Sequence, residues 1–212
     1  GEILDEVLCV QQDIGERISN IVMMGIGEPF DNFNNVVKFL KNVNNENGLN
    51  IGYRHISVST CGIVPKIYEF AKLNIPVTLS ISLHASDNNE RSRIMPVNNA
   101  YNIDELIKAC KEYINSTHRR VSFEYAVING VNDSAATAHR LARLVKGMLC
   151  HINIIPVNNV EENGFTKPSK EKIAAFVNVI DKYGIPVTVR RELGSDISAS
   201  CGQLRRNSIN NS

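Results

Sequence analysis

The stretch Asn20-Ile-Val-Met-Met-Gly-Ile-Gly-Glu-Pro29 says most about the fold of this chain. A short apolar run, residues 21–24, gives way to glycines, an acidic residue and a proline, and a helical pattern follows. This order predicts a buried parallel strand whose C-terminal end opens into a glycine-rich ligand loop. Glycines let a ligand approach the backbone, and Glu28 offers an acceptor for an ammonium or hydroxyl group. A dinucleotide-binding fingerprint needs a further glycine where Phe30 stands, so the loop does not fit a Rossmann phosphate site.

The succession of strand and helix continues along the chain. Apolar, β-branched runs predict strands at residues 20–25, 54–60, 76–83, 119–128, 150–156 and 185–190. Helical periodicity fills the intervals, at residues 2–18, 33–46, 63–73, 102–116, 134–147 and 169–183. Alternating helices and nearly continuous apolar strands indicate an α/β fold with a parallel sheet covered by helices. We expect a partial parallel (β/α) barrel of five or six strands, with a doubly wound open sheet as the alternative.

The composition is that of an ordinary globular protein. The 212 residues, 43% of them hydrophobic and 21% charged, are enough for one sizeable core. No apolar run approaches the roughly 18 residues of a membrane span, and no signal peptide opens the chain. We therefore expect a cytoplasmic protein without a membrane partner. We also expect a monomer, although no sequence pattern indicates the oligomeric state. The net charge of +1 gives no overall nucleic-acid footprint.

The cysteines do not form a recognisable framework. They are odd in number and lie far apart in the sequence, at Cys9, Cys61, Cys110, Cys150 and Cys201. This spacing fits neither a set of disulfides nor a Cys-x-x-Cys metal site. Three of them, Cys9, Cys110 and Cys150, lie in helical or strand patterns and are interpreted as core residues. We expect no role for Cys61, although it lies near the end of a predicted strand.

Polar residues follow several predicted strands at their C-terminal ends. Gly27 and Glu28 follow the strand at 20–25, Ser59 ends the next, Ser82-Leu83-His84 ends the third, and Asn158 follows the strand at 150–156. In parallel α/β folds, ligands bind at this edge of the sheet. The set contains hydrogen-bonding groups but no nucleophile–base pair, which favours holding a polar, zwitterionic, ribose-bearing ligand over hydrolysis.

These residues also have purely structural interpretations. The serines of the set are able to cap strand ends, and His84 is able to hydrogen-bond a neighbouring backbone carbonyl. Glu124, in the middle of a strand, would then pair with Arg54 or Arg119 inside the barrel. The common position of all these residues at one end of one sheet favours the functional interpretation.

Seven stretches resemble, in order, the radical S-adenosylmethionine (SAM) 23S rRNA adenine methyltransferases, which methylate C2 of adenine 2503 and have a sister group acting on C8. These stretches are Val22-Met-Met-Gly-Ile-Gly-Glu-Pro29, Ser57-Val-Ser-Thr60, Ser80-Ile-Ser-Leu-His-Ala85, Arg93-Ile-Met-Pro96, Asn132-Asp133, Ile154-Ile-Pro-Val-Asn158 and Ser200-Cys-Gly-Gln-Leu204. The resemblance implies a radical SAM core domain at residues 1–204, truncated at its N-terminus, and a C-terminal tail at 205–212. It implies SAM as cofactor and 23S rRNA as substrate, and leaves open C2 versus C8 and whether tRNA adenine 37 is a second substrate.

The resemblance also assigns roles to single residues. Gly27 and Glu28 would bind the amino group of the methionine part of SAM. Ser59, the Ser82-Leu83-His84 turn and Asn158 would contact the rest of SAM.

Cys201 would be the thiol that is methylated first and then carries the methyl carbon to the base. A 5′-deoxyadenosyl radical would abstract hydrogen from this methyl group, and the carbon radical would add to the adenine ring. A thiol suits the role because it loses its proton easily. The alternative, a buried structural cysteine, is disfavoured by the polar, small residues at 196–202.

One defining part of the family is absent from these 212 residues: the Cys-x-x-x-Cys-x-x-Cys motif that binds a [4Fe–4S] cluster. The resemblance places this motif, the first barrel strand, an RNA-binding domain, a second cysteine and a carboxylate base upstream of residue 1. We therefore expect a fragment of a longer enzyme, without metal ligands and inactive by itself.

Two other classes of function stay open. An ordinary β/α-barrel enzyme would need a Schiff-base lysine or catalytic carboxylate at a strand end, and neither is found; a SAM-binding module without catalysis would keep the pocket alone.

Overall fold

The computed structural model describes residues 1–157 and 165–191. Its strands form one parallel six-stranded sheet in the order β1-β2-β3-β4-β5-β6. They are β1 (Ile21–Met23), β2 (Ile56–Thr60), β3 (Thr78–Ser82), β4 (Val121–Val127), β5 (Cys150–Pro156) and β6 (Val187–Val189). A doubly wound sheet reverses its strand order at a switch point. The strictly sequential order therefore agrees with the predicted partial barrel and not with its alternative.

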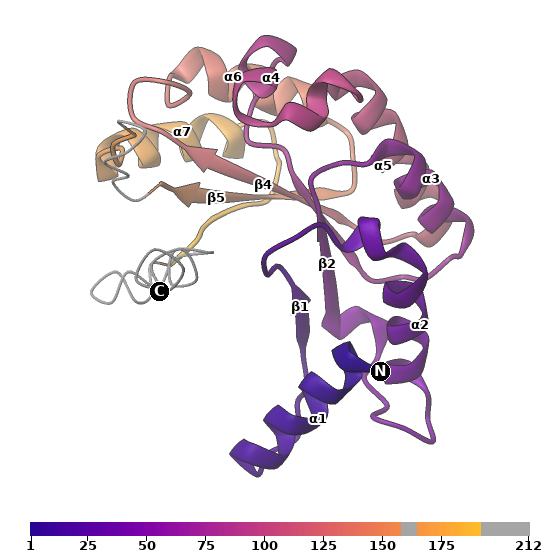
Figure 1. Cartoon of the computed structure of the whole chain (residues 1–212). Helices are drawn as coiled ribbons and strands as arrows, with labels where there is room; N and C mark the ends of the chain where they lie inside the picture. Colours follow the sequence, from indigo (N-terminus) through magenta and orange to yellow (C-terminus); the bar gives the residue numbers. More distant parts are fainter. Residues whose placement is uncertain (158–164, 192–212) are drawn as a thin grey trace, which may run out of the picture.

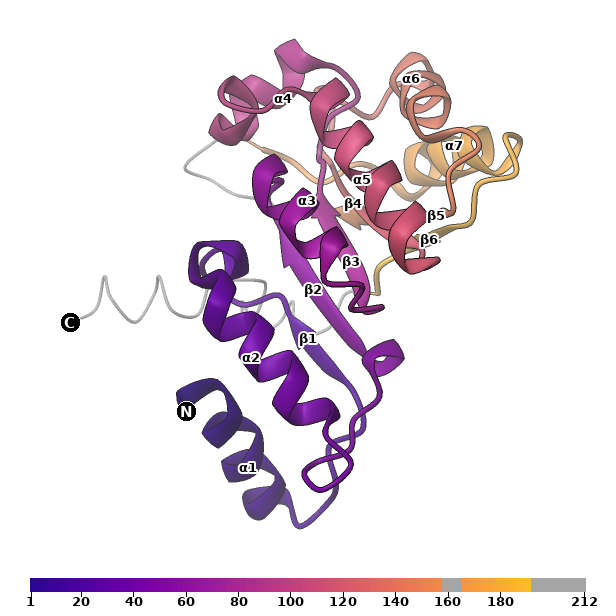
Figure 2. The same ribbon diagram turned by 90° about the vertical axis from the view of Figure 1, so that its right-hand side faces the viewer.

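Helices and 3-10 turns connect the strands. The helices are α1 (Glu2–Ile14), α2 (Phe33–Asn44), α3 (Val64–Lys72), α4 (Asn88–Ile94), α5 (Ile103–Thr117), α6 (Ala135–Val145) and α7 (Lys170–Asp181). The 3-10 turns are η1 (Pro29–Asn32), η2 (Tyr53–His55) and η3 (Pro96–Asn99). In Figures 1 and 2 the strands line the inner side of an arc, and the helices cover its outer side.

Successive side chains of a strand point to opposite faces of the sheet, and here the two faces differ in polarity. Ile56 and Val58 of β2, like Leu79 and Ile81 of β3, are fully buried, each with 0% exposure. They belong to the core under the outer helices. The alternate residues of the same strands are serines and a threonine. The sheet thus packs on its outer face and presents polar groups on its inner face.

Aromatic side chains join the outer helices to the sheet. Phe70 of α3 stacks on Tyr113 of α5, with ring centroids 5.7 Å apart and planes at 2°. The Tyr113 hydroxyl donates to the carbonyls of Ile75 (3.0 Å) and Val77 (2.9 Å), just before β3. A buried tyrosine needs such a partner for its hydroxyl, and these bonds fix α5 over the start of β3.

All six predicted strands and the six predicted helices are present in the described residues, with shifted ends. The prediction that the first strand is buried is wrong, because β1 lies at the edge of the sheet and none of its three residues is buried. Helix α1 ends early, at Ile14, because Gly15 adopts a left-handed conformation (φ 68°) and caps it. Helix α4 was not predicted: it is short, and it begins where the Asp87 side chain accepts the N–H of Glu90. The interpretation of Cys9 as a core residue is wrong, because α1 turns this thiol to solvent, whereas Cys110 and Cys150 are buried as expected.

Across residues 1–157 and 165–191, no helix has both the length and the hydropathy needed to span a bilayer.

Candidate functional site

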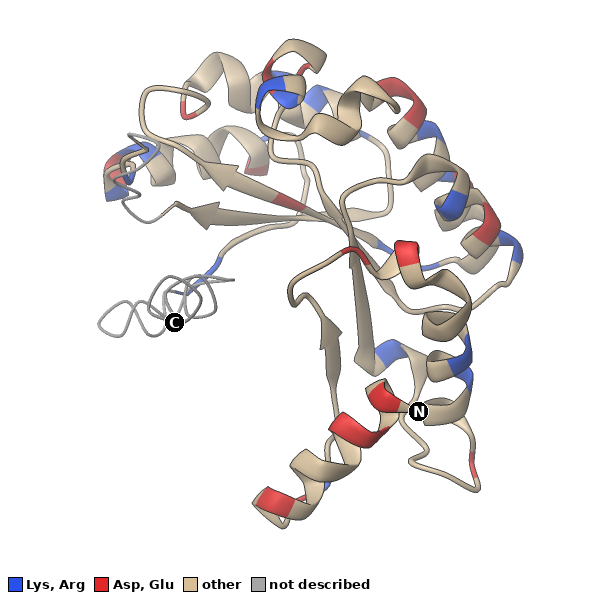
Figure 3. Ribbon diagram, viewed as in Figure 1, with Lys and Arg blue, Asp and Glu red and all other residues tan. Residues whose placement is uncertain are grey.

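The inner face of the sheet is lined with polar side chains. The strand register places Ser59 beside Ser80, Ser82 beside Glu124, and Glu124 beside Asn153 on this face. A closed β/α barrel fills the corresponding face with layers of branched apolar side chains. Most charged residues lie on the helices and connections rather than on the strands (Figure 3). Apart from Glu124, the strand residues named here therefore offer uncharged hydrogen-bonding groups on the inner face.

The loop after β1 is held by the carboxylate of Glu28. Its Oε1 accepts the N–H of Phe30 (3.0 Å), and its Oε2 accepts the N–H of Cys61 (2.7 Å) at the end of β2. Gly27 precedes it with φ 107°, a backbone conformation that favours glycine. Each carboxylate oxygen has two acceptor sites, so both oxygens of Glu28 can accept a further donor from a ligand.

Ser59 and Ser82 lie on the inner face at the ends of β2 and β3 and are partly exposed. Neither hydroxyl has a hydrogen-bond partner among the residues that the structure describes. The interpretation of these serines as strand-end caps therefore finds no support in this part of the chain. The next residue, Leu83, is different: its side chain is fully buried in the core, so only its backbone lies at the edge of the site.

His84 follows β3 with a left-handed backbone (φ 56°). Its Nδ1 accepts the N–H of Ala126 at 3.1 Å. The structural alternative, a bond from the ring to a backbone carbonyl, is therefore wrong for this nitrogen. Burial, together with the charge of Arg91, lowers the pKa of His84 to about 4. The imidazole is thus neutral near pH 7 and carries its proton on Nε2, which is a donor.

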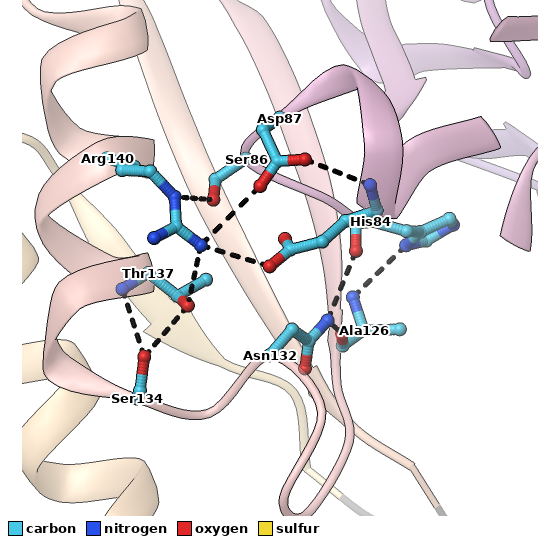
Figure 4. Close-up of polar contacts among 9 residues, drawn as sticks. His84, Ser86, Asp87, Ala126, Asn132, Ser134, Thr137 and Arg140 are labelled. Carbon is cyan, nitrogen blue, oxygen red and sulfur yellow. Dashed lines mark hydrogen bonds and ion pairs between the residues drawn. The ribbon is translucent and has the colours of Figure 1, made fainter. Parts of the chain in front are cut away.

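The turn that carries His84 is fixed by Asn132 (Figure 4). The Asn132 side chain is buried, donates to the carbonyls of His84 (3.2 Å) and Ala126 (2.8 Å), and accepts the N–H of Ile128 (2.7 Å). The sequence contained Asn132 only as part of a matching stretch, and no pattern indicated this role. Its effect is to bind the turn after β3 to the end of β4.

Arg140 of α6 holds the next residues of the turn (Figure 4). Its guanidinium donates to Ser86 Oγ (3.2 Å) and Glu90 Oε1 (3.0 Å), and lies 3.5 Å from Asp87 Oδ2. The segment between β3 and α4 is therefore tied to both β4 and α6 before any ligand binds.

Glu124 does not pair with Arg54 or Arg119, so that structural interpretation is wrong. Its carboxylate accepts the hydroxyl of Ser122 (2.9 Å) and the side-chain amide of Asn153 (2.6 Å). The backbone carbonyl of Glu124 accepts the N–H groups of Leu83 and His84. Glu124 thus joins β4 to β5 through its side chain and to the turn after β3 through its backbone.

Cys61 is unsuited to nucleophilic chemistry. Burial raises its pKa to about 12, and the hydrogen bond and negative charge of Glu28 act in the same direction. The group therefore stays a thiol at neutral pH.

Asn158 and Cys201 lie outside the described residues. Within residues 1–157 and 165–191, no three His, Cys, Asp or Glu side chains gather as a metal site requires.

The comparisons with known proteins agree on one family. The family described as the Radical SAM superfamily matches residues 2–142. The "Probable dual-specificity RNA methyltransferase RlmN" of Clostridium botulinum (strain Alaska E43 / Type E3) is 58% identical over 209 residues, which cover 99% of this chain and 60% of the relative. The protein of the same name from Clostridioides difficile (strain 630) is 58% identical over 205 residues, covering 97% of this chain and 60% of the relative.

A solved structure, a radical SAM methyltransferase from Sphaerobacter thermophilus, has 45% sequence identity and a TM-score of 0.87. The match covers 95% of this chain and 59% of that chain. The chain therefore spans about 60% of the length of the curated relatives it matches.

Proposed function

Because the chain belongs to the radical SAM superfamily, we propose that it forms the SAM-binding part of a methyltransferase that acts on RNA. One observation carries the SAM site: Glu28, Ser59, Ser82 and His84 come from three successive strand ends and offer a carboxylate, two hydroxyls without partners among the described residues and a neutral imidazole. SAM carries an ammonium group, ribose hydroxyls and a purine, and these groups match that set. RNA as substrate is supported by the similarity to proteins named RNA methyltransferases.

Each residue has a defined task in this proposal. Glu28, held by two backbone N–H groups, accepts hydrogen bonds from the ammonium group, and charge-assisted bonds of this kind are short and strong. Gly27 provides the positive φ that the loop needs. Ser59 and Ser82 bind polar atoms of SAM, and His84 donates from Nε2. Leu83 contributes through its backbone, and Asn158 completes the set from outside the described residues.

SAM supplies the methyl group, and together with a [4Fe–4S] cluster it supplies the radical chemistry of this superfamily. The described cysteines do not fit a cluster site: Cys9 lies on α1, Cys61 after β2, Cys110 on α5 and Cys150 on β5. The proposal therefore assigns the cluster ligands to residues outside this chain.

The finer parts of the proposal concern the acceptor and the carrier of the methyl group. Cys201 carries the methyl carbon, and the acceptor is C2 of adenine 2503 in 23S rRNA. The protein acts as a monomer in the cytoplasm, where this RNA is found. C8 as the acceptor atom, tRNA adenine 37 as a second substrate and a SAM-binding module without catalysis are the competing outcomes of the test.

The test uses the whole gene product, loaded with cluster and incubated with SAM and 23S rRNA. Mass spectrometry should find a methyl group on Cys201, and digestion of the RNA should release 2-methyladenosine. Cys201→Ala should remove both signals and leave SAM binding intact, whereas Cys9→Ala, at an exposed thiol, should change neither.

Three results would each overturn a different part of the proposed function. Methylation by Cys201→Ala removes Cys201 from the mechanism, 8-methyladenosine corrects the acceptor atom, and SAM binding without RNA methylation by the wild type leaves a binding module. A repeat with tRNA decides the second substrate.

A further inference from the structure

Arg91 is an unusual residue of α4, because its side chain is fully buried, with 0% exposure. In the described part of the chain no carboxylate lies within 4.0 Å of its guanidinium. A buried charge without a counter-ion is costly unless hydrogen bonds replace its water. Burial accordingly lowers the pKa of Arg91. The groups around Arg91 must therefore supply the hydrogen bonds that water would otherwise provide.

The groups around Arg91 are backbone carbonyls of two strand ends. Its Nη2 donates to the carbonyls of Cys61 (2.6 Å) and Ser82 (3.1 Å), and its Nε donates to that of Leu83 (3.2 Å). Its Nη1 donates to Asn98 Oδ1 (3.3 Å) of η3. One guanidinium thus bridges the end of β2 and the end of β3, the two strands that deliver Ser59 and Ser82.

The turn after β2 is adapted to this arrangement at Gly62. Gly62 has φ 105°, a conformation that side chains rarely adopt. A Cβ at this position would lie 3.0 Å from Leu106 Cδ1 and 3.4 Å from Arg91 Nη2. The backbone conformation therefore favours glycine, and a side chain here would also crowd Leu106 and lie against the guanidinium.

We propose that Arg91 is a positioning residue that joins the ends of β2 and β3, so that Ser59, Ser82 and His84 face one ligand. The inference rests on the proposed SAM site. Ser59 lies two residues before Cys61, and Ser82 and Leu83 are themselves bound. The three hydrogen bonds of Arg91 to backbone carbonyls therefore constrain positions at or beside the ligand-facing residues. A planar fork of fixed donors sets the separation of the two strand ends, which a flexible ammonium group cannot do.

The first experiment measures the affinity of S-adenosylhomocysteine for the whole gene product by calorimetry, at a temperature where every variant is folded. Arg91→Lys keeps the charge but loses the fork, and should weaken binding about tenfold; Arg91→Gln should weaken it by about a hundredfold. Arg93→Gln, on the same helix at an exposed arginine, should bind like the wild type. Partial rescue by lysine, with a graded loss of affinity, is not expected of a residue that only stabilises the core.

Hydrogen exchange in the same variants shows where the change occurs. Peptides that cover the ends of β2 and β3 should exchange faster in the Arg91 variants, whereas peptides of α1 and α2 should not change. Folded Arg91 variants with wild-type affinity would overturn the inference, and so would equal losses for Arg91→Gln and Arg93→Gln.

A measurement on the wild-type protein tests the inference even if the Arg91 variants do not fold. In cluster-free protein labelled uniformly with ¹⁵N, the Nε–H signal of Arg91 should shift with S-adenosylhomocysteine over the same concentrations as the amides of Ser82 and His84. If the amides shift but the Arg91 signal does not, the inference is overturned and the proposed SAM site is not. Failure of the wild type to bind S-adenosylhomocysteine at all would overturn the SAM site and the inference with it.

Discussion

The turn after β3 and the loop after β1 both carry residues of the proposed site, but the protein holds them by different means. Around the turn after β3, two buried polar side chains donate to backbone carbonyls: Asn132 is 2% exposed and Arg91 0%. Between them, Arg91 and Asn132 bind the carbonyls of Ser82, Leu83 and His84. Unpaired polar groups in such a place are costly, so this side of the site is rigid before a ligand arrives.

The loop after β1 has much less support. Strand β1 has three residues, none of them buried, and α1 has no buried residue. Val22 and Ile26 are 66% and 61% exposed. A cavity of about 550 Å³ separates α1, β1 and α2 and reaches Glu28. Here the carboxylate of Glu28 supplies a side-chain hydrogen bond from the loop to the end of β2. Binding loops are commonly drawn from such weakly packed parts of a protein, so we expect a preformed side and an adaptable side.

The largest expected effect comes from Asn132→Asp, a change of nearly equal shape on the rigid side. The new carboxyl group would face the carbonyls of His84 and Ala126 with an acceptor where Asn132 has a donor. We expect a loss of about 3–5 kcal/mol of unfolding free energy, as for a buried charge without a partner. Asn35→Asp, at an exposed asparagine of α2, should cost less than about 0.5 kcal/mol. Urea unfolding measures both, and similar losses would contradict the rigidity of the β3 side.

The next effect depends on pH and concerns His84. In the folded state its pKa is about 4, and its ordinary value is 6.5. As the pH falls from 6.5 to 4, the unfolded chain takes up a proton that the folded chain refuses. Stability from this group is therefore complete above pH 6.5 and lost toward pH 4, by up to about 3 kcal/mol.

The matched variants replace two histidines that share a left-handed backbone. His84→Asn should flatten the fall in stability between pH 7 and pH 4.5, because asparagine tolerates this conformation and does not titrate. His118→Asn, at an exposed histidine with φ 52°, should leave the fall as in the wild type. Equal pH profiles for the wild type and His84→Asn would mean that His84 is not held neutral.

The smallest expected effect is on the β1 side, for Glu28→Gln. A glutamine keeps one acceptor oxygen but turns an NH₂ group toward an N–H of Phe30 or Cys61. We expect a loss of about 1–2 kcal/mol and faster hydrogen exchange at the amide of Cys61. Glu69→Gln, at an exposed carboxylate paired with Lys66, should cost less than about 1 kcal/mol. Faster exchange spreading to β3 and β4 would show that the two sides are not independent.

Much of the architecture was predictable because its signals are local. Apolar runs of strand length, helical periodicity and glycine-rich breaks occur within a few residues of one another, and they predicted the six strands and their common edge. The serines at alternate positions of 57–59 and 78–82 were equally visible. Ser59 and Ser82 were singled out as candidates for ligand binding, but the alternation was not interpreted as a polar inner face, because parallel strands are commonly apolar on both faces.

Other features could not be read from the chain, because they depend on which distant segments meet. Arg91 is buried because its guanidinium finds hydrogen-bond acceptors in the carbonyls at the ends of β2 and β3. The sequence does not indicate this, since charged residues are ordinarily exposed. The partners of Glu124 turned out to be Ser122 and Asn153 rather than an arginine. Cys9 is exposed because it lies on the face of α1 that points to solvent. Apolar residues occur on several sides of this helix, so the pattern does not show which face is buried.

The sequence by itself thus determined the order of strands and helices, the common edge at which their polar residues end and, through its resemblance, the family. Those properties follow from local periodicity and turn chemistry. Only the tertiary structure decided which side chains hold the proposed site: a buried guanidinium and a buried amide on one side, and the Glu28 carboxylate on the other. A hydrogen bond between residues thirty or more positions apart depends on the packed geometry of the whole sheet, and no short stretch of the chain encodes it.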